Sequence, residues 1–359
     1  MLEQLTRQLA AGGALADEQI ALAVEGLTGE TIPAALKADF LIALARKGET
    51  PGEIAGFARA LRDKAVQPPL DPETRSRGIL DVVGTGGDRL GTFNISTAAA
   101  LVCAAAGVTV AKHGNRAVTS QAGSADVLEA LGVRIDLTPA DAVRSLRERR
   151  FAFFFAPSYH PAFKNISSAR RLCAERGQRT IFNLLGPLLN PARPSAVLAG
   201  VPGPEWCEPL ARVLQALGVR RAMVVCGSVA EHRELPNGIP HPAPAGACLD
   251  ELSTLGPNTI AEFYQERGLA VSKVPLGSFP LQPAALADLL GGDKSANAAI
   301  VRRIFSGAER GPRRDAVLLN TAAALFVAGL IRSLAEGWDL AAAVIDSGQA
   351  QAKLEELAQ

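Results

Sequence analysis

The segment from Ile79 to Gly114 constrains the fold more than any other part of the chain. A short β-branched run, ILDVVG, ends in glycines, an Ala-rich helical stretch follows, and a second strand-like run, VTVAKHG, also ends in glycine. Strand, loop, helix and strand in this order are typical of a parallel sheet with crossover helices. The segment therefore predicts an α/β fold with a mostly parallel central sheet.

Further strand-like runs continue this pattern, with helical stretches between them. We expect strands in VRIDL (133–137), FAFFFAP (151–157), AVLAGV (196–201), RAMVVCG (221–227) and AVSKVPL (270–276). The chain then closes with two helical runs, LLNTAAALFVAGLIRSLAEG (318–337) and LAAAVIDSGQAQAKLEELA (340–358). Residues 79–359 are thus predicted to form one large α/β domain.

The first 66 residues follow a different pattern. Their apolar residues recur at helical spacing, as in DEQIALAVEGL, and the helical runs break at Gly and Pro, so residues 1–66 are predicted to form a small helical domain. QPPLDPETRSRG (67–78) then brings three prolines and mixed charge. Such a run is typical of a linker, and we expect a hinge there.

Charge and cysteine usage exclude several classes of function. Lys and Arg total 37 against 36 Asp and Glu, a net charge of +1, so no global field favours nucleic acid or an anionic membrane. The five cysteines never show C-x-x-C spacing, which indicates reduced thiols in a cytosol rather than a disulfide framework or a zinc site. The start, MLEQLTRQLAAG, has no apolar block after its charges, so we expect neither signal peptide nor anchor. The prediction is a cytoplasmic protein that binds neither nucleic acid nor membrane.

Residues 84–97 contain the first candidate for a binding site. GTGGD (84–88) follows a strand and precedes a helix, where glycines let backbone N–H groups approach an anion and the helix N-terminus adds partial positive charge. The helix should begin near Asn94, and Ser96 or Thr97 could alternatively serve as a simple N-cap. The run fits neither GxxxxGK[ST] nor GxGxxG.

A second polar run follows the next predicted strand. That strand ends in KHGNR (112–116), and TSQAGS (119–124) comes directly after it. Each of these residues alone could be an ordinary solvated side chain. Because the carboxyl ends of neighbouring parallel strands lie side by side and bind ligands there, we expect the two polar runs to form one phosphate-binding wall.

The order of these motifs resembles a known family. GTGGD, NxST, KHGNRxxTS and GSADVLEALG resemble the anthranilate phosphoribosyltransferases of tryptophan biosynthesis, and the likeness continues through FAPSYHPAFK, RTIFNLLGPLLNPARP, LDELSTLGP and DAVLLNTAAALFVAGLIRSLAEG. The resemblance implies transfer of a 5-phosphoribosyl group from phosphoribosyl pyrophosphate to the amine of anthranilate, with Mg²⁺ as cofactor, in a homodimer. It also implies a nucleoside phosphorylase-like fold in which helices from about 160–190 join the N-terminal domain.

The resemblance further implies roles for individual residues. Those expected to bind phosphoribosyl pyrophosphate are Gly84, Thr85, Gly87, Asp88, Thr92, Asn94, Ser96, Thr97, Lys112, Ser120 and Ser124. Those expected to line the anthranilate path are Gly84, His113, Asn115, His160, Phe163 and Arg170, with Pro157 and Tyr159 as further walls. Those expected to hold Mg²⁺ are Ser96, Asp250 and Glu251. Lys112 would stabilise the leaving pyrophosphate, and no general base is assigned because the aniline nitrogen is neutral and nucleophilic at pH 7.

The chemistry of these side chains agrees with the implied roles. Mg²⁺ prefers oxygen ligands and is usually held by one or two carboxylates plus substrate phosphates, as Asp250 and Glu251 would allow. A guanidinium such as that of Arg170 suits a carboxylate. Taken alone, each of these side chains would be read as a solvated surface charge.

Three features depart from the family pattern. Gln121 stands where Lys or Arg is common, RLCAERGQRT (171–180) is three residues longer than the short family form, and EHRELPNGIPHPAPAGA (231–247) is a Pro-rich insertion. We expect the insertion to be a surface loop. Two alternatives stay open at this point, a pyrimidine nucleoside phosphorylase and a non-catalytic relative that binds nucleic acid.

Overall fold

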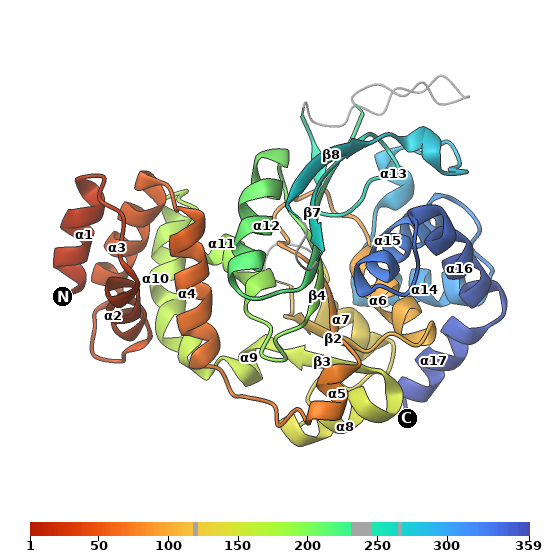
Figure 1. Cartoon of the computed structure of the whole chain (residues 1–359), viewed down its shortest axis with the longest axis horizontal. Helices are drawn as coiled ribbons and strands as arrows, with labels where there is room; N and C mark the ends of the chain where they lie inside the picture. Colours follow the sequence, from red (N-terminus) through yellow and green to blue (C-terminus); the bar gives the residue numbers. More distant parts are fainter. Residues whose placement is uncertain (118–120, 231–245, 265–267) are drawn as a thin grey trace.

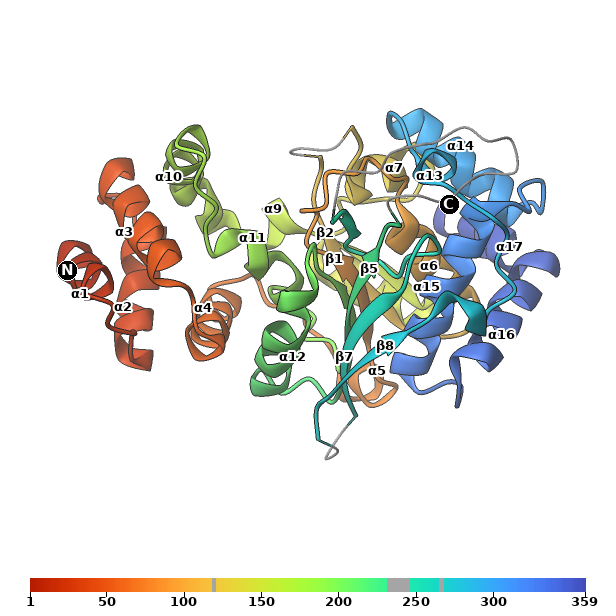
Figure 2. The same cartoon turned by 90° about the horizontal axis from the view of Figure 1, so that it is seen from above.

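The computed structural model describes residues 1–117, 121–230, 246–264 and 268–359. Figures 1 and 2 show a small helical part at the N-terminal end of the chain beside a larger part in which helices surround a sheet. The predicted fold class is confirmed, because a helical unit lies beside an α/β unit with a mostly parallel sheet. Within the described residues, no helix is both long and apolar enough to cross a membrane.

The N-terminal part is a helical bundle. Its helices are α1 (Leu2–Ala10), α2 (Asp17–Thr28), α3 (Ala34–Lys47) and α4 (Pro51–Asp63), and α10 (Lys164–Glu175) returns from the middle of the chain to pack against α3. Helix α4 begins with a capping box, in which Glu53 N donates to Thr50 Oγ1 and Thr50 N donates to the Glu53 carboxylate. The bundle is therefore closed by residues from two distant parts of the sequence (Figure 1).

The sheet of the larger part has the order β3-β2-β1-β4-β5-β7-β8, and β6 pairs with β5. Its strands are β1 (Leu80–Gly84), β2 (Val110–Gly114), β3 (Phe151–Phe155), β4 (Ala196–Gly200), β5 (Arg221–Ser228), β6 (Cys248–Leu249), β7 (Asn258–Tyr264) and β8 (Ala270–Val274). Strands β3, β2, β1, β4 and β5 run parallel to one another, whereas β6, β7 and β8 pair antiparallel. The carboxyl ends of β1, β2 and β4 consequently meet at one edge.

Helices cover both faces of the sheet. The described helices of this part are α5 (Pro72–Ser76), α6 (Ile95–Ala105), α7 (Ser124–Ala130), α8 (Pro139–Arg149), α9 (Ala156–Tyr159), α11 (Phe182–Leu185), α12 (Cys207–Ala216), α13 (Leu286–Leu289), α14 (Lys294–Phe305), α15 (Pro312–Ala328), α16 (Leu334–Asp346) and α17 (Gln349–Leu357), with 3-10 turns at Pro161–Phe163, Gly186–Leu188, Pro204–Trp206 and Leu276–Ser278. Successive side chains of a strand point to opposite faces. Leu198 accordingly joins the core with α6 and α15, while Val197 and Ala199 join the core that continues into α12 and the bundle.

One predicted strand is wrong. Residues 133–137 form no strand, although Val133 and Ile135 are buried and Arg134 between them is exposed. The alternation reflects two side chains packed on the core from a segment that pairs with no strand of the sheet. In addition, β7 was not identified from the sequence. The closing helical runs are also divided differently, since Gly329 and Gly348 adopt positive φ and separate α15, α16 and α17.

Candidate active site

The glycine-rich turn after β1 leads into α6, which begins at Ile95 as expected. Gly86 and Gly91 both adopt φ of 71°, a backbone conformation that favours glycine. The simple N-cap interpretation is wrong, because Asn94 rather than Ser96 or Thr97 occupies the N-cap position, and the Asn94 side chain makes no capping hydrogen bond. Instead, Ser96 N donates to Glu251 Oε1 at 3.1 Å. The start of α6 therefore meets a carboxylate from a distant part of the chain.

The segment after β6 lies across the carboxyl ends of the parallel strands. Asp250 Oδ2 accepts hydrogen bonds from Gly86 N at 2.5 Å and from Thr85 Oγ1 at 3.3 Å. This close approach requires glycines beneath it, since a Cβ at Gly200 would lie 1.6 Å from the Asp250 carbonyl oxygen and a Cβ at Gly84 would lie 2.9 Å from Asp250 Oδ2. The absence of side chains at Gly84 and Gly200 thus leaves the space at the strand ends that Asp250 occupies.

The two carboxylates lie in an electrostatically unfavourable place. Burial raises the pKa of Asp250, and the neighbouring Asp88 raises it further. Burial likewise raises the pKa of Glu251, with a second contribution from Asp250, and Lys112 opposes the shift only in part. Among the described residues no cluster of three His, Cys, Asp or Glu side chains could hold a metal by itself. A divalent cation that shared these carboxylates with a bound phosphate would relieve the repulsion and fit the oxygen chemistry.

Lys112 is buried beside this pair. Its Nζ donates to Val82 O at 2.6 Å, and its side chain is 2% exposed. Burial lowers the pKa of Lys112, whereas the charges of Asp81 and Glu251 favour its protonated form. The Lys112 ammonium is therefore close enough to the carboxylates of Asp81 and Glu251 to interact with both.

Asp81 is a residue that the sequence analysis missed. It is fully buried, and Asn190 Nδ2 donates to its Oδ2 at 2.8 Å. Burial raises the pKa of Asp81 to about 6, although Lys112 opposes the change. The signal was an acidic residue within the otherwise apolar run ILDVVG, where a buried charge needs a partner.

The residues expected along the acceptor path form a row of rings. The centroids of His113 and His160 lie 5.3 Å apart, and those of His160 and Phe163 lie 5.0 Å apart. Phe163 then contacts Phe182 edge-on at 5.7 Å, and the Arg170 guanidinium lies over the Phe182 ring at 5.3 Å. Sequence analysis did not identify Phe182, which lies between Ile181 and Asn183 in the motif RTIFNLLG. The row ends at a guanidinium.

Both histidines are neutral at pH 7. Burial lowers the pKa of His113 to about 3 and that of His160 to about 4. His160 Nε2 lies 3.1 Å from Leu189 O, so we assign its proton to this nitrogen. His113 Nε2 is buried without a hydrogen-bond partner in the described part of the chain. The row thus offers one unsatisfied ring nitrogen in addition to its apolar faces.

The remaining residues that the sequence predicted for the site lie in several different places. Asn115 and Ser124 meet, because Ser124 Oγ donates to Asn115 O at 3.4 Å. Thr97 is buried with its hydroxyl unpartnered, and Thr92 bridges to Leu290. Tyr159 is buried against Phe154 and Pro157 is exposed, and their place along the path stays a prediction. Ser120 lies outside the described residues.

The cation missing at Gln121 is not supplied by Arg116. The Arg116 guanidinium forms ion pairs with Asp126 at 3.0 Å and with Glu129 at 2.9 Å. Gln121 itself is exposed. Position 121, where we expect the family to have Lys or Arg, is therefore neutral here. Arg116 already forms ion pairs with two carboxylates of α7.

Comparisons with known proteins agree with this geometry. Residues 3–65 match a family model described as the helical bundle domain of a glycosyl transferase family, and residues 76–236 and 243–351 match the a/b domain of such a family. The chain is 46% identical over 351 residues to the anthranilate phosphoribosyltransferase of Roseiflexus castenholzii, covering 98% of this chain and 95% of that protein. It is 45% identical over 361 residues to that of Symbiobacterium thermophilum, covering 99% and 96%.

Solved structures give the same result. The anthranilate phosphoribosyltransferase of Thermus thermophilus matches with a TM-score of 0.83 at 40% identity, covering 99% of this chain and 98% of that one. The enzyme from Saccharomyces cerevisiae, solved in complex with phosphoribosyl pyrophosphate and Mg, matches with a TM-score of 0.83 at 26% identity, covering 99% and 96%. Sequence and fold therefore agree over nearly the whole chain.

Proposed function

The chain belongs to the anthranilate phosphoribosyltransferase family of glycosyl transferases, and we propose that it transfers the 5-phosphoribosyl group of phosphoribosyl pyrophosphate to the amine of anthranilate. One observation carries this proposal. Asp250 and Glu251, which repel each other in a buried position, are hydrogen-bonded to the GTGGD turn and to the start of α6. A magnesium pyrophosphate group would meet both the charge and the donors of this place.

Asp250, Glu251 and Ser96 would hold Mg²⁺. Bound there, the ion would supply positive charge to offset that of the departing pyrophosphate. The support from this chain is the pair of raised carboxyl pKa values, which mark a site short of positive charge. The yeast relative solved with phosphoribosyl pyrophosphate and Mg gives independent support.

The leaving group would meet preorganised donors on its other sides. Loss of pyrophosphate develops oxocarbenium character on the ribose and negative charge on the departing oxygen. Backbone N–H groups of the turn at Gly84–Asp88, with Thr85, Asn94 and Thr97, would bind the phosphates, and Lys112 would stabilise the new charge. Lys112 suits this role because burial keeps it from rearranging when the charge appears.

Anthranilate would approach along the row of rings. Arg170 would bind its carboxylate, while the faces of Phe163 and His160 would hold the flat ring. His113 Nε2, unpartnered and neutral, would accept a hydrogen bond from the amine without removing its proton. The amine is already nucleophilic at neutral pH, so the path needs to orient it and exclude water rather than supply a strong base.

The segment 67–78 would act as the hinge between the helical unit (1–66) and the α/β unit (79–359). We infer that closure about this segment brings the acceptor path to the phosphate wall. We also expect a homodimer in the cytoplasm, as the family resemblance implies. Sedimentation equilibrium of the purified chain tests the oligomeric state, and a concentration-independent monomer mass would contradict it.

The activity is tested by following the loss of anthranilate fluorescence in the presence of phosphoribosyl pyrophosphate and Mg²⁺. Loss that requires both additions supports the proposal. The same preparation should be tried with phosphate and thymidine or uridine, the reaction of the related pyrimidine nucleoside phosphorylases. Phosphorolysis without any use of anthranilate would overturn the proposed substrate pair.

A further inference from the structure

A cavity of about 700 Å³ lies at the edge of the sheet opposite to the candidate active site. We call it the hinge cavity, and its lining residues are Leu70, Pro72, Arg75, Ser76, Ile79, Arg193, Ser195 and Arg220. Five of these eight belong to the segment from the linker to the start of β1, and Ser195 and Arg220 directly precede β4 and β5. The amino ends of three parallel strands thus face the linker across this space.

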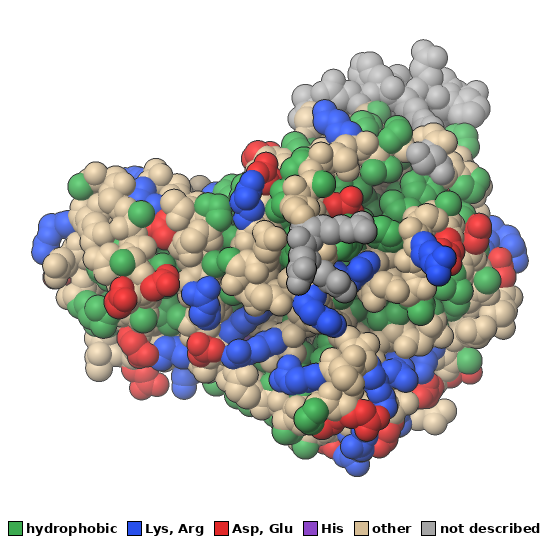
Figure 3. Space-filling model, viewed as in Figure 1, with side chains coloured by type: hydrophobic (Ala, Val, Ile, Leu, Met, Phe, Trp, Pro, Cys, Tyr) green, Lys and Arg blue, Asp and Glu red, His purple; other side chains and the backbone are tan. Residues whose placement is uncertain are grey.

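The hinge cavity carries an excess of positive charge. Three of its lining side chains are guanidinium groups, and the described residues that line it include no carboxylate. Arg75 and Arg220 make no side-chain hydrogen bond or ion pair within the described chain. Only Arg193 is paired, at 2.8 Å from Asp63 at the end of α4. On the face seen in Figure 3, Lys and Arg side chains also gather where the bundle meets the larger part.

Arg193 adopts an uncommon backbone conformation. Its φ is 49°, in the left-handed region that residues with a side chain seldom occupy. Such a conformation persists where the surroundings demand it and is often found at functional positions. Here it accompanies a guanidinium that both lines the hinge cavity and pairs with the helical unit.

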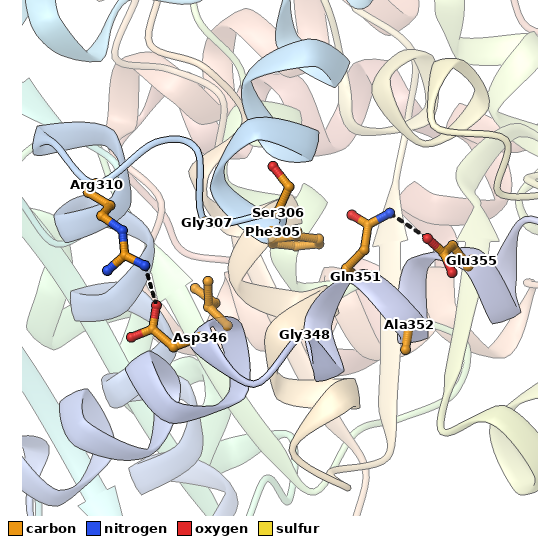
Figure 4. A pocket seen from close by; sticks show the side chains of 10 residues that line it. Phe305, Ser306, Gly307, Arg310, Asp346, Gly348, Gln351, Ala352 and Glu355 are labelled. Atoms are coloured by element: carbon orange, nitrogen blue, oxygen red, sulfur yellow. Dashed lines mark hydrogen bonds and ion pairs between the residues drawn. The ribbon is translucent and has the colours of Figure 1, made fainter.

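A second cavity, of about 330 Å³ among α14, α16 and α17, provides a contrast. Figure 4 shows Arg310 directed at Asp346 on one side of Phe305, and Gln351 directed at Glu355 on the other. These polar groups have partners, with Arg310 at 3.7 Å from Asp346 and Gln351 Nε2 at 2.7 Å from Glu355 Oε1. The hinge cavity differs because two of its three cations have no partner among the described residues.

We propose that the hinge cavity binds a small multivalent phosphate, either free phosphate or a phosphate ester. Guanidinium groups present paired N–H donors that match phosphate oxygens, and a cleft lined by one sign of charge concentrates counter-ions. The hydroxyls of Ser76 and Ser195 lie in the same wall as further donors. The ligand would connect the linker, through Arg75, to the sheet, through Arg220.

Binding would also affect the hinge. A phosphate bound to Arg193 would compete with Asp63. The ion pair between Arg193 and Asp63 connects the end of α4 to the segment before β4. The ligand therefore exchanges a contact between the two units for contacts within the larger one. Because both partners of the present pair are partly exposed, the exchange costs little.

The test uses the full chain without Mg²⁺ or either substrate, and inorganic phosphate as the probe at constant ionic strength. The unfolding temperature is measured against phosphate concentration for the parent, for Arg75→Gln/Arg220→Gln and for the control Arg7→Gln/Arg332→Gln. The control removes the same charge from exposed positions on α1 and after α15. We expect equal rises in the parent and control, and about half that rise or less in the hinge variant.

Phosphate at the candidate active site contributes equally to all three proteins, since neither pair of substitutions touches it. Equal rises in all three, or no rise in any, would overturn the proposal, as would an equal loss in the control. Asp63→Asn frees Arg193 and should lower the half-saturating phosphate concentration several-fold, and an unchanged value counts against the role of Arg193.

Two further anions define the class of ligand. Ribose 5-phosphate should raise the unfolding temperature as phosphate does if esters are accepted, and a rise with phosphate alone would restrict the ligand to the free ion. Citrate should have a smaller effect. A larger effect of citrate that disappears in Arg75→Gln/Arg220→Gln would replace the phosphate ligand by a polycarboxylate and overturn the assignment.

Discussion

The two ends of the candidate active site have opposite electrostatics. At the phosphate end, Asp250, Glu251 and Lys112 are buried ionisable groups whose pKa values are shifted toward the neutral form. At the acceptor end, His113 and His160 are buried but neutral, and their rings stack in an apolar row. Without a ligand, the buried ionisable groups of the phosphate end destabilise the folded protein, whereas the neutral rings of the acceptor end stabilise it.

This difference suggests how one site treats two unlike substrates. Ionisation of both carboxyls at the phosphate end creates repulsion that a cation relieves, and a bound polyanion can share that cation, so we expect this end to select by charge. The acceptor end offers shape, ring faces and one guanidinium, so it selects by flatness and a single carboxylate. Substitutions should therefore separate the two ends, with the largest effects where the charge is densest.

The largest effect is expected from Asp250→Asn/Glu251→Gln. Turnover should fall by about 10³-fold or more, because the stabilisation of the leaving group is lost. At the same time the metal-free protein should unfold at a higher temperature near pH 8. The pKa of each carboxyl is raised in the folded state, so the folded state loses stability as pH rises through the raised pKa, and neutral amides remove that loss.

Calorimetry without Mg²⁺ and a fluorescence assay with it measure these two effects on the same preparation. Asp136→Asn/Glu148→Gln is the matched control, since both side chains are exposed and should change neither property. A double variant with parental turnover at saturating Mg²⁺ would remove the metal assignment, and a lower unfolding temperature would contradict the repulsion between the ionised carboxyls.

The next largest effect tests the acceptor end. Arg170→Ala should raise the Michaelis constant for anthranilate by roughly 10- to 100-fold, the equivalent of one charge-assisted hydrogen bond, and leave that for phosphoribosyl pyrophosphate within about twofold. Arg171→Ala is the control, because this neighbour on the same helix is exposed like Arg170 but makes no ring contact within the described residues. Equal losses for both substrates would mean that Arg170 supports the structure of the site rather than anthranilate binding.

A pH titration tests the phosphate end without any substitution. Mg²⁺ must displace protons from carboxyls whose pKa is raised, so its apparent affinity should weaken by about tenfold per pH unit for each proton displaced as the pH falls below about 8. Titration calorimetry with Mg²⁺ and pyrophosphate, in two buffers with different ionisation enthalpies, counts the protons released. No release near pH 7 would show that the pair is already ionised.

The smallest effect concerns Gln121→Lys. A cation here should lower the Michaelis constant for phosphoribosyl pyrophosphate several-fold, since a charge-assisted hydrogen bond exceeds a neutral one by about 1 kcal/mol. Low salt should enlarge the change because Gln121 is exposed. Arg116 does not fill the place, as it pairs with Asp126 and Glu129. Unchanged or weaker binding at both salt concentrations would show that another cation, such as Arg89, already serves.

Local patterns predicted those parts of the molecule that depend on neighbouring residues. The parallel strands and the start of α6 at Ile95 follow from β-branched runs, glycines and an Ala-rich stretch within one segment. The strand predicted at 133–137 failed for the converse reason: alternation shows that one side is buried, but pairing needs a neighbouring strand that local sequence does not contain.

Within the candidate site, the missed residues act through distant partners. Asp81 matters because Asn190 reaches it from 109 positions away, and Phe182 matters because Arg170 and Phe163 lie against its ring. Neither contact leaves a periodic signal. The pairing of Arg116 with α7 was equally unpredictable, since a surface cation in a loop has many possible partners.

The glycines packed against Asp250 have a genetic consequence. At Gly200 and Gly84 the missing side chain, rather than any chemical group, is what admits the acidic segment, and Gly227 is in the same position, with Ser253 Cβ at 2.4 Å from an added Cβ. In a random library screened for growth without tryptophan, these three codons should tolerate no amino-acid change, much like the codons of the carboxylates. Mutational intolerance would then mark an empty space as clearly as a reactive atom.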